Sequence, residues 1–201
     1  MRQEVERCSQ AVGLAAEGER VAVICSGDPG IYAMAGLVFE ISRGQGSGSA
    51  GQDIQIEVIP GIPAFSASAA RLGAPLMHDF ASISLSDLLT PWEVIEKRLE
   101  AAASADFVIV IYNPKSKGRQ EQIKKARDII LKSRSGETPV GIVRSAMRDN
   151  ESVTITDLEN MPDNEIDMQS MVIIGNSQTF VWQDWMVTPR GYSGKYKISG
   201  S

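Results

Sequence analysis

Hydrophobic residues along the chain alternate between a helical spacing and short runs rich in apolar residues. Residues 2–17 place Val5, Cys8, Val12 and Ala15 on one helical face, which predicts an amphipathic first helix. Further helices are expected at residues 31–42, after Pro63, from Pro91 and at residues 119–132. Strands are expected at residues 21–25, 54–59, 80–85, 107–112, 140–143, 152–156 and 171–174.

This order of elements indicates the fold class. Strands that alternate with helices of about 10–15 residues predict an α/β protein with a largely parallel sheet. The runs FVIVIY and MVIIG are apolar throughout, which is typical of strands covered on both faces. The 201 residues allow one large α/β domain or two small ones.

Two segments carry local signals of their own. Thr90-Pro91-Trp92-Glu93 has the form of a capping box with proline at the first helical position, so a helix is expected to start there. Residues 43–53, RGQGSGSAGQD, have the composition of a flexible Gly/Ser-rich connection.

Unusual loops follow four of the expected strands. They cover residues 26–30 (SGDPG), 60–64 (PGIPA), 85–87 (LSD) and 112–114 (YNP). A single Gly/Pro-rich loop is ordinary turn chemistry. In open α/β sheets, however, ligands bind outside the carboxyl ends of the strands. Four such loops in one chain therefore favour a shared ligand cleft.

Composition excludes several classes of protein. A net charge of -5 argues against a general nucleic-acid binder, which would carry a basic face. No apolar run approaches the roughly 20 residues of a membrane span, and the N-terminus lacks the apolar core of a signal peptide. Two cysteines and one histidine argue against a disulfide framework and a His-based metal site. A cytoplasmic location is expected.

The familiar catalytic and nucleotide motifs are missing from the sequence. There is no G-x-G-x-x-G after a strand, no G-x-x-x-x-G-K-[ST], no G-x-S-x-G elbow and no Cys–His pair. The chemistry is therefore expected to depend on a bound cofactor.

Several longer segments carry a family resemblance. SGDPGIYAMAGLVFE, VIPGIPAFSASAARLGAPLMHDF, PVGIVRSAMRDNES and IIGNSQTF resemble the tetrapyrrole (corrin/porphyrin) methylases of cobalamin biosynthesis. SLSDLLTPW and YNPKSKGR point to the ring-contracting branch. The resemblance extends to TPRGY and so covers nearly the whole chain. It implies two α/β/α domains with S-adenosylmethionine in the cleft between them: residues 1–77, and residues 78–201.

The sequence departs from the family pattern at its N-terminus, and the resemblance implies a set of cofactor contacts. Family members usually begin with a strand and a Gly-Pro-Gly loop that this sequence lacks, so its first domain is expected to be truncated. The implied contacts of S-adenosylmethionine, and of its product S-adenosylhomocysteine, are Ser26, Gly27, Asp28, Ile31, Pro63, Ala64, Asn113 and Ala146. The alternative for Asp28 is an Asx-type turn residue. Asn113 stands where related methylases often carry Met.

The implied substrate is a polycarboxylate macrocycle, which requires cationic side chains. Lys115, Lys117 and Arg119 follow one expected strand and Arg144 follows another, with Ser86 as a further candidate for substrate binding. For the lysines and for Arg144, the alternative is a solvated loop.

His78 and Asp87 are the candidate catalytic groups for moving protons. Ring contraction after methylation moves protons on the oxygen functions of the substrate, and His titrates near neutral pH. A structural role for His78 and a turn or capping role for Asp87 are the alternatives.

The expected function is S-adenosylmethionine-dependent methylation of a corrin precursor, precorrin-3B or cobalt-factor III, at C-17 with ring contraction. Alternatives are a methylase of the same fold acting on another tetrapyrrole position or acceptor, and a non-catalytic truncated binding module. A small-molecule tetrapyrrole and a second copy in a homodimer are the expected partners, with no nucleic acid or membrane.

Overall fold

The computed structural model describes residues 3–45 and 54–196, and the chain divides into two compact units. Unit 1 is Met1–Ala64 and unit 2 is Phe65–Ser201. The domain boundary expected after residue 77 stays a prediction. Most of the Gly/Ser-rich connection expected at residues 43–53 lies outside the described residues; residues 43–45 belong to a helix.

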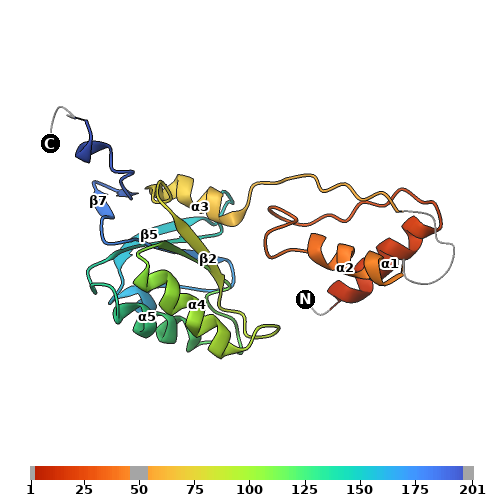
Figure 1. The fold of residues 1–201 in the computed structure, drawn as a ribbon, viewed down its shortest axis with the longest axis horizontal. Helices are drawn as coiled ribbons and strands as arrows, with labels where there is room; N and C mark the ends of the chain where they lie inside the picture. The colour runs from red at the N-terminus through yellow and green to blue at the C-terminus, as the bar shows by residue number, and fades with distance from the viewer. Residues whose placement is uncertain (1–2, 46–53, 197–201) are drawn as a thin grey trace. The chain divides into compact units, whose positions relative to one another are not determined.

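Unit 1 contains two helices that pack against each other, α1 (Glu4–Ala16) and α2 (Ala35–Gln45) (Figure 1). Cys8 and Val12, two of the four residues that predicted the α1 face, are buried. Both helices are confirmed. The second begins at Ala35 rather than residue 31, because the preceding residues form a turn in which Tyr32 has a left-handed backbone (φ 51°).

The strands expected at residues 21–25 and 54–59 are wrong. Neither segment pairs with a strand within the described part of the chain. Their apolar side chains are largely open to solvent, with Ile24 82% and Ile59 72% exposed. A run of apolar residues favours extended backbone, but a strand also needs a neighbour to accept and donate its ladder hydrogen bonds.

Unit 2 is built on a five-stranded sheet in the order β2-β3-β6-β4-β5 (Figure 1). The strands are β2 (Phe80–Ser84), β3 (Val108–Tyr112), β4 (Pro139–Arg144), β5 (Ser152–Asp157) and β6 (Ser170–Ile174). Each matches an expected strand within a residue or two.

The expected parallel arrangement of these strands is wrong. Only β2 and β3 are parallel, whereas β3–β6, β6–β4 and β4–β5 are antiparallel. A parallel neighbour needs a long crossover, normally a helix. The connection from β4 to β5 spans only residues 145–151, which is too short for such a crossover. The connection from β5 to β6 contains the short 3-10 helix η1 (Met161–Asp163) and places β6 on the other side of β4, where it runs antiparallel to both β4 and β3.

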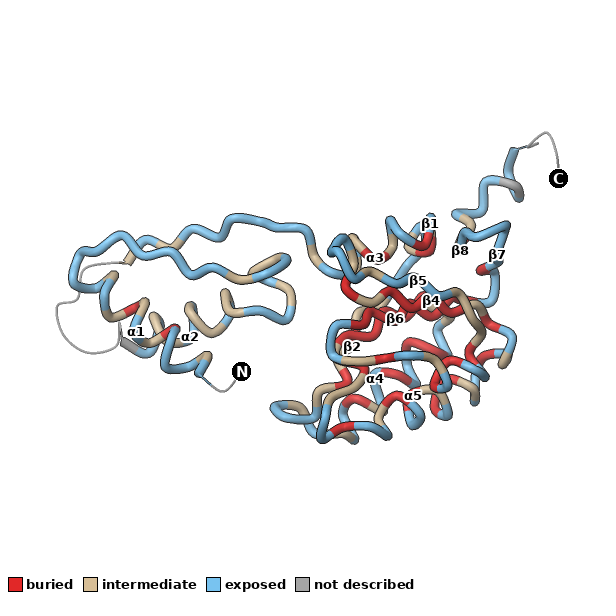
Figure 2. Tube along the Cα trace, turned by 180° about the vertical axis from the view of Figure 1, so that it is seen from behind, coloured by how far each residue is buried: buried red, intermediate tan, exposed pale blue. Residues whose placement is uncertain are grey.

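Helices cover both faces of this sheet (Figure 2). Helices α4 (Trp92–Ser104) and α5 (Gln122–Leu131) bury Ile95, Leu99 and Ile130 on one face. Helix α3 (Ala64–Leu72) lies on the other, where Leu72 packs so close to Gly141 of β4 that a Cβ there would stand 2.4 Å from Leu72 Cδ1. Every residue of β3 and β6 is buried, which confirms the prediction drawn from their continuous apolar runs.

The start of α4 differs from the expected capping box. Pro91 is the N-cap, with φ -55° and ψ 142°, and no side chain caps the helix. A capping box needs its Thr directly before the first helical residue. The first helical residue is Trp92, so Pro91 occupies the N-cap position and Thr90 stands one position too early to cap the helix.

Three short strands and a terminal turn complete unit 2. The strands β1 (Gly73–Ala74), β8 (Trp185–Val187) and β7 (Phe180–Trp182) form a separate sheet in that order, and η2 (Tyr192–Gly194) is a 3-10 turn. Two- and three-residue strands are too short for a periodic signal in the sequence. Among the described residues, no helix has the length and apolar character needed to cross a membrane.

Candidate functional site

Asp28 joins two of the predicted ligand loops in unit 1. Its Oδ1 accepts a hydrogen bond from the Gly30 N–H at 2.8 Å, which is the turn role considered for this residue. Its Oδ2 accepts one from the Gly61 N–H at 3.2 Å, across 33 positions of sequence. The carboxylate therefore ties the SGDPG loop to the PGIP segment, although the strands expected before these loops do not form.

Gly61 is required for this close approach. A Cβ at Gly61 would stand 2.2 Å from the Gly27 carbonyl oxygen and 2.9 Å from its carbonyl carbon. Gly27 itself has φ 79°, a backbone conformation that glycine adopts without a steric penalty. The local structure therefore explains why glycine stands at both positions. Together the two glycines bring the predicted cofactor contacts Gly27 and Asp28 against the PGIP segment.

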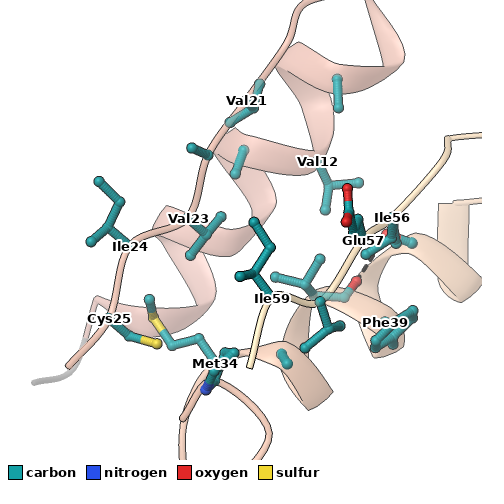
Figure 3. Close-up of a pocket in the computed structure, with 18 of the residues that line it drawn as sticks. Val12, Val21, Val23, Ile24, Cys25, Met34, Phe39, Ile56, Glu57 and Ile59 are labelled. Atoms are coloured by element: carbon teal, nitrogen blue, oxygen red, sulfur yellow. Dashed lines mark hydrogen bonds between the residues drawn. The ribbon is translucent and has the colours of Figure 1, made fainter. Parts of the chain in front are cut away.

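A cavity of about 720 Å³ lies beside these loops in unit 1. Helices α1 and α2 and the extended segments 21–25 and 54–61 line it, mostly with apolar side chains. Figure 3 shows Val23 and Ile59 projecting into this space from the two extended segments, with Met34 nearby. Gly27 and Gly61 also line the cavity, so its wall includes both loops that Asp28 joins.

In unit 2, polar side chains meet at the carboxyl ends of the parallel strands β2 and β3. Asn113 Nδ2 donates a hydrogen bond to Ser84 Oγ at 2.9 Å, and the Ser86 N–H donates to the same oxygen at 3.2 Å. The structure thus brings Asn113 and Ser86 together through Ser84. It leaves Asn113 Oδ1 without a donor among the described residues.

Left-handed backbone conformations occur at or directly beside three of the predicted cofactor residues. Asn113 has φ 50°, and Ala146 lies between Ser145 (φ 51°) and Met147 (φ 61°). Tyr32, next to Ile31, has φ 51°. Residues other than glycine rarely adopt this region, and when they do they cluster at ligand-binding and active sites. These four account for most of the six such residues in the described ranges.

The lysines predicted to bind substrate line a hollow of about 300 Å³. Lys115 and Lys117 share it with Gln120 and with the segment Ile166–Gln169. Neither lysine makes an ion pair with the described residues. The hollow therefore presents two cations to solvent.

Arg119 has a different environment from these lysines. It is 8% exposed, its Nη1 donates to the Leu85 carbonyl at 3.0 Å, and its buried Nε has no hydrogen-bond partner in the described structure. Arg119 therefore holds the loop after β2 against the loop after β3. Its expected contact with substrate stays a prediction.

Arg144 is held by two carboxylates. Its Nε donates to Asp167 Oδ2 at 2.7 Å, and its Nη1 lies 3.1 Å from Glu165 Oε1. A substrate carboxylate would have to share this guanidinium with both acids. Its role in substrate binding also stays a prediction.

The pKa of Asp167 is held below its ordinary value of 3.8. Burial works against ionisation, but hydrogen bonds donated by the Gln169 N–H, by Arg144 and by Ser170 outweigh it. A carboxyl with a lowered folded-state pKa stabilises the fold above its unfolded pKa, and this stability is lost as the pH falls through the folded-state pKa.

We expect Asp167→Asn to flatten the acid side of the stability profile. Below about pH 4 the urea midpoint of the wild type should fall more steeply than that of the variant. The side chain is 39% exposed, so solvent screening keeps the difference to about 1 kcal/mol or less. Urea unfolding followed by circular dichroism over this pH range measures it. Parallel profiles for the two proteins would contradict the assignment.

The structure does not bring His78 and Asp87 together. His78 precedes β2, and its Nδ1 accepts a hydrogen bond from the Asp79 N–H at 2.9 Å. Asp87 follows β2, and its Oδ2 accepts one from Gln122 Nε2 at 3.0 Å. A five-residue strand spans roughly 17 Å. The two groups therefore cannot serve one reacting atom, and a proton-handling role for either stays a prediction.

Glu151 is a site residue that sequence reasoning missed. Its carboxylate contacts Arg71 of α3 and the Met147 N–H, both at 2.6 Å, and so fixes the loop that carries Ala146. The pairing with Arg71 spans 80 positions. No local pattern in the sequence signals it.

Known proteins match this sequence over nearly its whole length. The model of the Tetrapyrrole (Corrin/Porphyrin) Methylases matches residues 2–162. The cobalt-factor III methyltransferase of Priestia megaterium is 54% identical over 99% of this chain, and the chain spans 37% of that protein's length. The probable cobalt-factor III C(17)-methyltransferase of Salmonella typhimurium is 52% identical over 96% of this chain and 78% of its own.

Solved structures share the fold. The methyltransferase CobJ superposes with a TM-score of 0.85 at 38% identity, covering 94% of this chain and 77% of its own. The uroporphyrin-III C-methyl transferase of Thermus thermophilus, complexed with S-adenyl homocysteine, gives a TM-score of 0.60 at 20% identity, over 86% of this chain and 74% of its own. At that identity the likeness shows the fold alone.

These findings agree with the motifs and confirm the expected fold class. The family model covers most of the chain, and the Salmonella relative and CobJ are each matched over more than three quarters of their length. The chain belongs to the tetrapyrrole (corrin/porphyrin) methylase family.

Proposed function

We propose that this chain is an S-adenosylmethionine-dependent C-methyltransferase that methylates a corrin precursor at C-17 with ring contraction, in cobalamin biosynthesis. The substrate is precorrin-3B or cobalt-factor III. The observation that carries this proposal is the 52% identity to the Salmonella cobalt-factor III C(17)-methyltransferase across 78% of that protein. The 41% identity to the Sinorhizobium precorrin-3B C(17)-methyltransferase supports the same reaction on a related acceptor.

The proposed cofactor contacts are Ser26, Gly27, Asp28, Ile31, Pro63 and Ala64 in unit 1, with Asn113 and Ala146 in unit 2. The donor set fits S-adenosylmethionine, because the loops offer backbone amides and small apolar side chains, and Asn113 keeps its Oδ1 as an acceptor. The left-handed residues at and beside these positions support the assignment. The S-adenyl homocysteine in the structure of the Thermus enzyme, which shares the fold, supports the choice of cofactor.

Methyl transfer requires the protein mainly to position the methyl donor and the acceptor. An electron-rich carbon of the acceptor would form a bond in line to the methyl group of S-adenosylmethionine, while the bond from that methyl to the sulfonium sulfur breaks and the thioether S-adenosylhomocysteine leaves. Holding donor and acceptor in line can supply on the order of 7–11 kcal/mol of rate acceleration in favourable cases. The loops tied by Asp28, and the Ser84–Asn113 pair, fix backbone and amide groups for such a role. This requirement agrees with a sequence that has no recognisable motif of a catalytic triad.

The surface beside β2 and β3 supports a polycarboxylate macrocycle as the substrate. Lys115 and Lys117 provide positive charge at the loop after β3. Leu88 and Leu89 in the loop after β2 are 82% and 93% exposed. Arg119 links these two loops through its hydrogen bond to the Leu85 carbonyl. Apolar side chains beside cations suit a flat ring with carboxylates at its edge.

We expect the double variant Lys115→Gln/Lys117→Gln to bind the polycarboxylate porphyrin uroporphyrin about tenfold more weakly. Each half-exposed charge contact contributes up to about 1 kcal/mol, and 1.4 kcal/mol corresponds to a factor of ten. Fluorescence titration of the porphyrin measures the affinity.

The matched control is Lys124→Gln/Lys132→Gln, on α5 and at its C-cap. It changes the net charge equally but removes lysines that pair with Glu121 and Glu100. An equal loss of affinity in both double variants would mean that only overall charge attracts the porphyrin. The hollow would then not be the substrate site.

A non-catalytic binding module is the alternative from a different class. Binding of S-adenosylhomocysteine and of porphyrin, without methyl transfer to a corrin precursor, would favour it. A homodimer and a cytoplasmic location stay predictions.

A further inference from the structure

The loop between β4 and β5, residues 145–151, holds an unusual backbone conformation. Ser145 and Met147 are both left-handed, with φ 51° and 61°, and Ala146 lies between them. Neither residue is glycine, and in L-residues the Cβ crowds the carbonyl oxygen in this conformation. Such a loop persists only where surrounding contacts hold it.

The Ser145 side of the loop is fixed by the segment before β6. The Ser145 N–H donates to the Gln169 carbonyl at 3.0 Å, and Ser145 Oγ donates to Gln169 Oε1 at 3.1 Å. The Gln169 N–H in turn donates to Asp167 Oδ1 at 2.8 Å. This half of the loop is therefore tied to the segment that leads into β6, an interior strand of the sheet.

The Met147 side is fixed by Glu151, together with the backbone hydrogen bond that the Arg148 N–H donates to the Ser145 carbonyl at 3.0 Å. Glu151 Oε2 accepts the Met147 N–H at 2.6 Å, and Oε1 accepts Arg71 Nε at 2.6 Å. Both oxygens of one carboxylate are used, and the side chain is only 15% exposed. The hydrogen bond from the Met147 N–H is the main reason that the pKa of Glu151 lies below its ordinary value, so the group is ionised at neutral pH.

We infer that Glu151 is a positioning residue for ligand binding, which holds Met147 in its left-handed conformation and so presents the backbone around Ala146 to S-adenosylmethionine. This inference rests on the proposed function, which places Ala146 at the cofactor. Arg71 acts one step further back, because it anchors the second oxygen of Glu151 to α3. Met147 itself is 61% exposed, so no packing of its side chain replaces the hydrogen bond.

The test measures S-adenosylhomocysteine affinity by calorimetry for the wild type, Glu151→Ala and Glu151→Gln. We expect about a tenfold loss for Glu151→Ala and a smaller loss for Glu151→Gln, which keeps an acceptor for the Met147 N–H. Glu100→Ala is the matched control, because it breaks an ion pair with Lys132 at 3.1 Å on the same unit, away from the loop. It should bind like the wild type.

Substitutions at Met147 separate positioning from a merely structural tie. In the Glu151→Ala background, Met147→Gly should restore most of the affinity, because glycine adopts a positive φ without the Cβ penalty. Met147→Ala should not, since it removes the same side chain but keeps the Cβ. Thermal unfolding of each variant checks that affinity is compared between folded proteins.

Three results would overturn the inference, and they are distinguishable. Wild-type affinity in Glu151→Ala removes the positioning role while leaving the proposed function intact. Equal rescue by Met147→Gly and Met147→Ala shows that the backbone conformation is not what Glu151 controls. A wild-type chain that does not bind S-adenosylhomocysteine overturns the proposed function itself, and the inference with it.

Discussion

Replacing Gly61 by alanine should weaken S-adenosylhomocysteine binding by about ten- to a hundredfold. The added Cβ would stand 2.2 Å from the Gly27 carbonyl oxygen, a backbone atom that cannot rotate away. Relieving such an overlap typically costs about 1–3 kcal/mol. The cheapest relief is to separate the two loops, which breaks the hydrogen bond from the Gly61 N–H to Asp28 and displaces the proposed contacts Gly27 and Asp28.

The control for this variant is Gly13→Ala in α1 of the same unit. A Cβ at Gly13 meets nothing within 4 Å, and alanine is favoured over glycine inside a helix by roughly 0.5–1 kcal/mol. Gly13→Ala should therefore bind like the wild type and unfold at a slightly higher temperature. Calorimetric titration compares the three proteins. Unchanged affinity in Gly61→Ala would separate the loop contact from ligand binding.

Replacing Arg134 by methionine should destabilise unit 2 by about 3–4 kcal/mol. The Arg134 side chain is 3% exposed, and its guanidinium donates to the carbonyls of Ala103, Gly175 and Phe107 at 3.1, 2.8 and 2.8 Å. It also lies 3.3 Å from the Asp106 carboxylate. Burial lowers the pKa of Arg134 while Asp106 acts to raise it.

The size of this effect follows from what methionine leaves behind. It fills similar volume but donates no hydrogen bond, so carbonyls at the end of α4 and at the ends of β3 and β6 lose their partner. A buried polar group without a partner costs about 1–3 kcal/mol, more when the lost partner was charged. The Asp106 side chain is 41% exposed, so water can reach this part of the site in the variant. The total loss of stability is therefore smaller than the sum of the separate penalties.

Urea unfolding of Arg134→Met against Arg98→Met measures it. Arg98 lies on the exposed face of α4, and its substitution should change the free energy of unfolding by about 0.5 kcal/mol or less. A loss below about 1 kcal/mol in Arg134→Met would show that water or neighbouring groups satisfy the carbonyls without the guanidinium.

The fold of unit 2 could be predicted where one strand or helix carries its own pattern. The buried runs of β3 and β6 identified themselves by continuous apolar sequence, since both faces of these strands are covered. The parallel or antiparallel sense of the strands could not be predicted in the same way. It depends on the lengths of the connections, and the seven-residue loop after β4 allows only an antiparallel neighbour.

The two wrong strand predictions in unit 1 also concern pairing between segments. Apolar residues at 21–25 and 54–59 indicate extended backbone, and extended backbone is what the structure has. A strand is a property of two segments, and one segment's sequence does not report whether its neighbour is in place.

In the candidate site too, local features could be predicted from the sequence and long-range contacts could not. Asp28 and Gly61 were recognisable because each stands in a loop whose composition is unusual by itself. Their contact with each other was not recognisable, and neither was the pairing of Glu151 with Arg71. Arg119 shows the converse. It stands among lysines in the sequence, yet it is buried and binds a backbone carbonyl.

Direct titration tests most sharply whether the loops joined by Asp28 form part of a working cofactor site. Calorimetric titration of the chain with S-adenosylhomocysteine should give saturable one-to-one binding. Asp28→Ala, which removes both the turn hydrogen bond and the tie to Gly61, should weaken it at least about tenfold, a loss of 1.4 kcal/mol or more. Absence of saturable binding to a chain that circular dichroism shows to be folded would contradict the account.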